Sequence, residues 1–141
     1  MRGINSKTRK DKYKLEIYGI DIHVLINYTA DKVNRDYITY HEEELSSVDN
    51  NISSLLDGKA MHWGILKDRK TKQKVSIICI NTEEHDDIFD LIDSAAHESF
   101  HAASTLCDYV GMPLGRDSEE AYAYLCGYIT RCVYKTIFKK K

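Results

Sequence analysis

The sequence DDIFDLIDSAAHESFHAASTLC, from Asp86 to Cys107, carries the longest helical pattern of the chain. Its apolar residues recur every three or four positions and cover most of the circumference of a helix, which predicts a helix that is buried on most sides. Acidic residues fill its first turns, where they suit the positive end of the helix dipole. Gly111 and then Pro113 give the usual order of residues at the end of a helix.

A second helix is expected directly after the first. It should begin after Asp117 or Ser118 and run to about Phe138, with Lys139 to Lys141 complementing the C-terminal end of its dipole. The intervening loop, CDYVGMPLGRDS, is long enough to return the second helix antiparallel to the first. The second half of the chain is therefore expected to be a pair of consecutive helices.

Two β-hairpins are expected before the helices. The segments KLEIYG and IDIHVLINY, within residues 13–28, alternate apolar and polar side chains and meet at Gly19. Residues 60–67 (AMHWGILK) and 74–80 (KVSIICI) flank the polar turn DRKTKQ. A short helix is expected around residues 52–56. The predicted fold class is α+β, with a small antiparallel sheet packed on two consecutive helices.

Length and composition indicate one domain over residues 1–141. The chain is 43% hydrophobic and 30% charged with a single Pro, which is typical of a globular protein and excludes a largely disordered chain. Apolar runs such as Val75 to Ile80 are far shorter than the roughly 20 residues that cross a bilayer. No apolar segment follows the basic N-terminus, so no secretory signal is expected. These features predict a cytoplasmic protein without a membrane-spanning helix.

Charge gives little support to nucleic-acid binding. Twenty Lys and Arg residues against twenty-two Asp and Glu residues leave a net charge of -2. Residues 1–12 are basic and are expected to form a flexible tail, with a nucleic-acid-binding arm as the less favoured interpretation. The four cysteines lack a CxxC spacing, which argues against a cysteine-based zinc site and favours buried thiols in a reducing compartment.

The first helix contains His97-Glu98-Ser99-Phe100-His101, which matches the pattern HExxH. Two histidines four residues apart lie on one face of a helix and can chelate one metal ion. Glu98 lies about 100° round the helix from His97, where it can deprotonate a water molecule held by the metal. The pattern predicts a metal site with Glu98 as general base. The alternative is that both histidines only satisfy hydrogen bonds in the core.

A catalytic zinc ion takes three protein ligands, and no histidine follows His101. Cys107 is a less favoured third ligand, because Ser104 leaves the helix without a glycine on which to turn. Glu119 and Glu120, at the start of the second helix, are the favoured candidates.

Small residues decide between these two glutamates. Ala123 and Gly127 follow Glu120 at the spacing that lets one helix approach another closely, so Glu120 is preferred and Glu119 is the alternate. A capping role is the competing interpretation, because Asp117 and Glu120 also have the spacing of a capping box.

HESFH followed by EEAYAYLCG resembles the gluzincin branch of zinc metallopeptidases, over about residues 86–138. The chain also resembles the short HExxH proteins of bacteria and their phages. The resemblance implies a zinc site with His97, His101 and Glu120 as ligands and Glu98 as catalytic base. Thermolysin-like members carry an Asp that contacts a zinc-bound His, and here that position is Tyr124, which implies a weaker orientation of the histidine.

The predicted function is zinc-dependent hydrolysis of peptide bonds in a peptide or protein substrate. Tyr122 and Tyr124 are candidates for a hydrogen-bond donor to the transition state, although amphipathic packing is the favoured explanation for each of them. The hairpin of residues 60–80 is expected to offer a sheet edge to an extended substrate, with His62 and Trp63 beside it. The alternative function is a non-catalytic zinc-binding protein of assembly or interaction. In either case the short chain predicts either a shallow site or a cleft whose far wall is completed by a protein partner.

Overall fold

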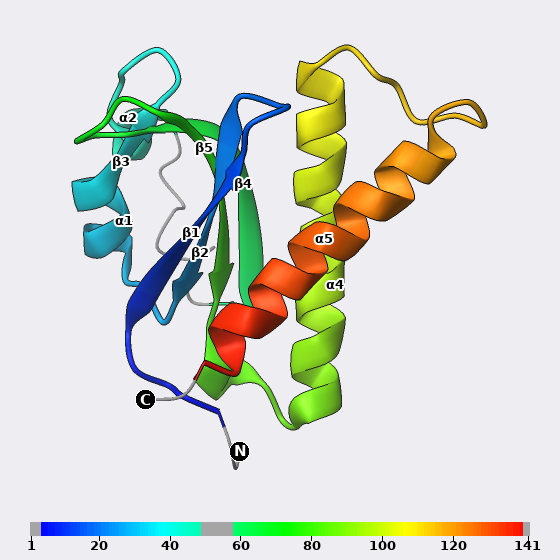
Figure 1. Ribbon diagram of the computed structural model, residues 1–141. Helices are drawn as coiled ribbons and strands as arrows, with labels where there is room; N and C mark the ends of the chain where they lie inside the picture. Colours follow the sequence, from blue (N-terminus) through cyan, green and yellow to red (C-terminus); the bar gives the residue numbers. More distant parts are fainter. Residues whose placement is uncertain (1–3, 49–57, 140–141) are drawn as a thin grey trace.

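The computed structural model describes residues 4–48 and 58–139. Within them a five-stranded sheet has the strand order β1-β2-β5-β4-β3, with two long helices on one of its faces (Figure 1). The elements, in chain order, are β1 (Arg9–Leu15), β2 (Ile20–Ile26), α1 (Ala30–Asp36), β3 (Tyr37–Thr39), α2 (Leu45–Val48), β4 (Ala60–Asp68), β5 (Lys74–Ile80), the 3-10 helix η1 (Thr82–Glu84), α4 (Ile88–Tyr109) and α5 (Glu119–Ile137).

Both expected hairpins are present. β1 pairs antiparallel with β2 across a turn at Gly19, whose φ of 68° is in the left-handed region that favours glycine. β4 pairs antiparallel with β5 across the polar turn of residues 68–73. The fold class, α+β with a sheet packed on two consecutive helices, is confirmed.

The sheet is mixed, which differs from the expected antiparallel sheet. β2 and β5 pair in parallel, with His23 opposite Ile77. The reason is the path of the chain between the two hairpins. After β2 it runs through α1 to the far edge of the sheet, and the return through β4 leaves β5 in the centre, pointing the same way as β2.

α4 and α5 cover one face of the sheet and close the larger of the two apolar clusters that the described residues form. Asp87 caps the start of α4, where its side chain accepts a hydrogen bond from the backbone N–H of Asp90. Gly111, with a φ of 75°, follows the end of α4 as expected. The cluster combines side chains from both helices and from the central strands, including Ile22, Val24, Ile78, Leu91, Ala103, Leu106, Leu125 and Ile129.

The opposite face of the sheet carries α1 and the second apolar cluster. Thr29 caps α1 by accepting a hydrogen bond from the backbone N–H of Lys32. Val33 and Tyr37, from α1 and β3, are fully buried against Leu25 and Ile77 of the sheet. Among the described residues, none of the helices has the length and apolar character required to cross a membrane.

Two interpretations of local structure need correction. Residues 9–12 belong to β1 and not to a flexible tail, because the Arg9 guanidinium donates to the C-terminal carbonyls of α5, those of Thr136 and Ile137. The N-cap of α5 is Ser118, without a side-chain capping bond, so Asp117 does not form the capping box of the competing interpretation. The expected helix at residues 52–56 lies outside the described residues.

Candidate metal site on helix α4

His97 and His101 lie one turn apart on the exposed side of α4. Their Nε2 atoms are 3.1 Å apart and their ring centroids are 4.8 Å apart. Both rings are exposed, and the side chain of His97 retains 67% of its accessible surface. Zn–N bonds of about 2.0–2.1 Å in tetrahedral geometry separate two ligand nitrogens by roughly 3.3 Å, so the observed pair is spaced to chelate one metal ion.

Glu98 lies on the neighbouring side of α4 and is directed towards β4. It is 8% exposed, and its Oε1 is 4.0 Å from Nε2 of His97. The backbone N–H of His62, on β4, donates to the Glu98 carboxylate. Burial raises the pKa of Glu98, and His97, His101 and the hydrogen bond from His62 oppose that rise. A glutamate with a raised pKa beside two imidazoles is suited to accept a proton.

His62 is the third histidine of this region. Its ring lies nearly parallel to that of His101, at 15°, with centroids 6.4 Å apart. Its Nε2 is 2.6 Å from the hydroxyl oxygen of Ser76, and that hydroxyl donates its own hydrogen to the Trp63 carbonyl. The Ser76 oxygen must therefore accept a hydrogen from Nε2, which leaves the Nδ1 lone pair of His62 free. Burial lowers the pKa of His62 to about 4, so this imidazole is neutral near pH 7.

A small pocket lies beside Glu98 and His97. It has a volume of about 200 Å³ and lies between the start of β4 and the first half of α4. Lys59, at its rim, forms an ion pair with Asp90. The pocket is lined by Lys59, Ala60, Asp93, Ser94, His97 and Glu98.

The structure does not bring Glu120 or Glu119 to the histidine pair. Both are exposed in the first turn of α5, and Figure 1 shows this turn standing away from α4 while the middle of α5 crosses it. The two helices meet on another side of α4, where Cys107 is buried beside Tyr122. Cys107 lies six residues after His101 and hence about 120° round the helix.

The two candidate tyrosines are also separate from the histidines. Tyr122 is 6% exposed and its hydroxyl donates to the Met112 carbonyl at 3.1 Å, so it anchors the loop between the helices. Tyr124 is 74% exposed and lines a groove with the turn between β1 and β2. Neither phenol is positioned to orient His97.

The part of the chain that the structure describes contains no group of three or more His, Cys, Asp or Glu side chains that could hold a metal ion. Of the residues expected to form the metal site, the structure brings together His97, His101 and Glu98 and leaves Glu120 apart from them. The proximity of His62 to His101 was not predicted. Strand alternation places His62 on the face of β4 that α4 covers, and only the packing of α4 on β4 brings it to His101.

Comparison of the chain with protein-family models, with curated proteins and with solved structures found no match.

Proposed function

We propose that the protein is a zinc-dependent peptidase whose site is built on the HESFH segment of α4. The observation that carries this proposal is the 3.1 Å separation of the two exposed Nε2 atoms next to a buried carboxylate of raised pKa. A bound zinc ion would polarise the scissile carbonyl and acidify a water molecule. We further propose a cytoplasmic location, which agrees with the four free thiols of the chain.

The donor set fits zinc at two of the three protein positions that a catalytic ion requires. His97 and His101 supply those two positions. His62 is the nearest candidate for the third, because its neutral ring adjoins His101 and its Nδ1 has no partner among the described residues. Glu120 remains the candidate implied by the gluzincin resemblance. For Glu120 to bind the same ion, the first turn of α5 would have to approach α4.

Glu98 is the residue that moves a proton in this proposal. Its pKa is raised by burial, so its carboxylate gains more by protonation than an exposed glutamate does. The N–H of His62 holds the carboxylate against β4, next to the pocket that Glu98 and His97 line. Glu98 would take the proton of the attacking water and return it to the leaving amine.

A peptide-cleavage assay on the zinc-loaded full chain tests the proposal. Glu98→Gln should abolish cleavage and retain zinc, because the amide keeps the size of the side chain and loses the base. Zinc retention in His62→Phe and in Glu120→Gln identifies the third ligand, since the variant that loses zinc has lost that ligand. Unchanged cleavage by Glu98→Gln would overturn the proposal.

A non-catalytic zinc-binding protein is the second candidate function. The observation in its favour is an exposed apolar groove between the turn after β1 and the face of α5, where Ile17 is 94% exposed and Tyr124 is 74% exposed. Contiguous apolar surface of this kind is typical of protein-protein contact. Under this alternative, zinc would stabilise folding and Glu98→Gln would change neither stability nor partner binding.

A further inference from the structure

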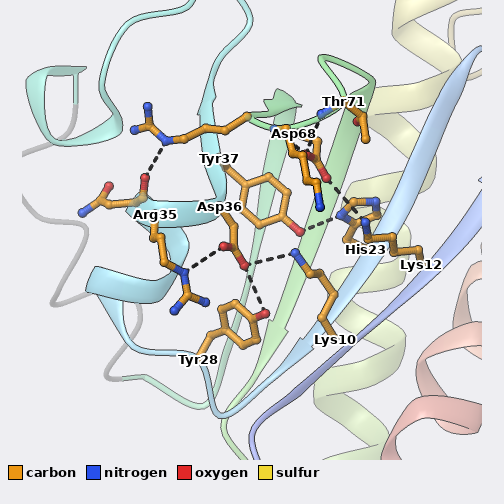
Figure 2. A network of polar contacts seen from close by, with 12 residues as sticks. Lys10, Lys12, His23, Tyr28, Arg35, Asp36, Tyr37, Asp68 and Thr71 are labelled. Atoms are coloured by element: carbon orange, nitrogen blue, oxygen red, sulfur yellow. Dashed lines mark hydrogen bonds and ion pairs between the residues drawn. The ribbon is translucent and has the colours of Figure 1, made fainter.

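A second pocket lies on the other face of the sheet, away from the HESFH segment. It has a volume of about 530 Å³ and is formed by β1, β2 and the turn between β4 and β5. His23, which is 2% exposed, is one of the residues that line it. Figure 2 shows the His23 ring between Tyr37 and Lys12.

The hydrogen bond to Tyr37 fixes the tautomer of His23. The Tyr37 hydroxyl is 2.6 Å from Nδ1, and Tyr37 is fully buried. This hydroxyl has no other acceptor among the described residues, so it donates its hydrogen to Nδ1, because an unsatisfied buried hydroxyl would cost free energy. The hydrogen of the neutral ring is then on Nε2, which has no partner within the described residues. Nε2 lies on the side of the ring away from Tyr37, and His23 lines the pocket, so this N–H is available to donate to a ligand there.

Asp21 supplies an acceptor on the same side of β2. It is two residues from His23, so both side chains are on one face of the strand, roughly 6–7 Å apart. Asp21 makes no hydrogen bond or ion pair within the described residues, although Lys14 lies opposite it on β1. Burial raises the pKa of Asp21, because its carboxylate is partly shielded from water.

The pocket carries charges of both signs. Lys12 lies opposite His23 on β1 and forms an ion pair with Asp68 at 3.6 Å. Asp68 also accepts backbone N–H groups from Lys70 and Thr71. The charged side chains that line the pocket are Lys12, Lys14, Glu16, Asp21 and Asp68. Three carboxylates repel a doubly charged anion such as phosphate, and the two lysines with the His23 N–H oppose a simple cation.

We propose that this pocket binds a small zwitterion, a free α-amino acid, whose carboxylate accepts the Nε2 hydrogen of His23 and whose ammonium group donates to Asp21. The ammonium and carboxylate of an amino acid, each with a hydrogen bond of about 2.8 Å, span the separation between Asp21 and His23. Lys12, beside His23, adds a second positive contact for the carboxylate. This site is independent of the proposed peptidase site, which lies across the sheet.

The experiment is an NMR titration of the full chain with each proteinogenic amino acid in turn. Acetate and methylammonium, which each carry one of the two charges, are the matched comparisons. We expect at least one amino acid to shift the backbone amide signals of Asp21 and His23, and to bind at least about tenfold more tightly than acetate or methylammonium. Absence of a shift with every amino acid, or equal binding of acetate, would overturn the proposal.

Two variants and one spectroscopic measurement complete the test. Asp21→Asn should weaken amino-acid binding about tenfold, because it removes the charge that faces the ammonium group. Asp117→Asn, the same chemical change at an exposed aspartate outside the pocket, is the control and should bind as the wild type does. Imidazole ¹⁵N shifts should show the hydrogen of His23 on Nε2. A hydrogen on Nδ1, or equal binding by both variants, would refute the inference.

Discussion

The buried pair of His23 and Tyr37 makes the stability of this protein depend on pH. Burial lowers the pKa of His23 from 6.5 to about 4 in the folded protein. The unfolded chain therefore binds a proton at this histidine between those two pH values and the folded chain does not. The resulting stabilisation, about 3 kcal/mol, is present above pH 6.5 and is lost as the pH falls towards 4.

The double variant His23→Leu/Tyr37→Phe tests this reasoning. It replaces both partners of the hydrogen bond by apolar side chains of similar size, which is nearly neutral for stability near pH 7. Between about pH 7 and about pH 4, the free energy of unfolding should fall by about 3 kcal/mol more in the wild type than in the double variant. Urea unfolding followed by far-ultraviolet circular dichroism at several pH values measures this difference.

The single variant Tyr37→Phe is the matched control. It leaves Nδ1 of His23 without its donor, so it should lower the free energy of unfolding by about 1–3 kcal/mol near neutral pH, while the pH dependence from His23 persists. The reasoning is refuted if the double variant keeps the pH dependence of the wild type. It is also refuted if Tyr37→Phe is as stable as the wild type.

Three further predictions concern single residues. Arg9→Met should lower the free energy of unfolding by about 2 kcal/mol, because the guanidinium donates to the C-terminal carbonyls of α5, whereas Lys7→Met should have little effect. Gly111→Ala should cost about 1 kcal/mol at its positive φ, whereas Gly127→Ala, inside α5 with no atom close to the added Cβ, should stabilise by about 0.5–1 kcal/mol. Thermal and urea unfolding measure these four changes. Because burial raises the pKa of Glu98, peptide cleavage should rise with pH through a pKa above that of an exposed glutamate.

Each of these predictions has an outcome that contradicts it. Equal stabilities of Arg9→Met and Lys7→Met would show that the guanidinium does not stabilise the end of α5. Equal effects of the two glycine substitutions would contradict the left-handed conformation of Gly111. A pH profile of cleavage with its acid limb in the range of an exposed glutamate would contradict the role of Glu98 as a buried base.

The local pattern of the sequence predicts the elements well, because each depends on near neighbours. The apolar period before Gly111 predicts α4, and the alternation on both sides of Gly19 predicts the first hairpin. The parallel pairing of β2 with β5 joins residues more than fifty positions apart, and no local pattern contains it. The sequence around Arg9 is typical of a charged tail, because the carbonyl group that Arg9 binds, that of Ile137, is at the other end of the chain.

Only the part of the candidate site that lies on a single helix can be predicted from the sequence. The spacing of His97 and His101 fixes their separation, since both belong to α4. The place of Glu120 depends on the angle at which α5 crosses α4, which side chains such as Tyr122 set through packing. His62 reaches His101 through the packing of a strand against a helix, which a linear motif does not encode.

The most direct test of the central proposal is the zinc content of the full chain purified without added metal. We expect one zinc ion per chain in the wild type and in Glu98→Gln, and loss of zinc in His97→Ala and in His101→Ala. His41→Ala, at an exposed histidine outside the site, is the control and should retain zinc. A wild-type protein without bound metal, or equal zinc in all of these variants, would contradict the proposal.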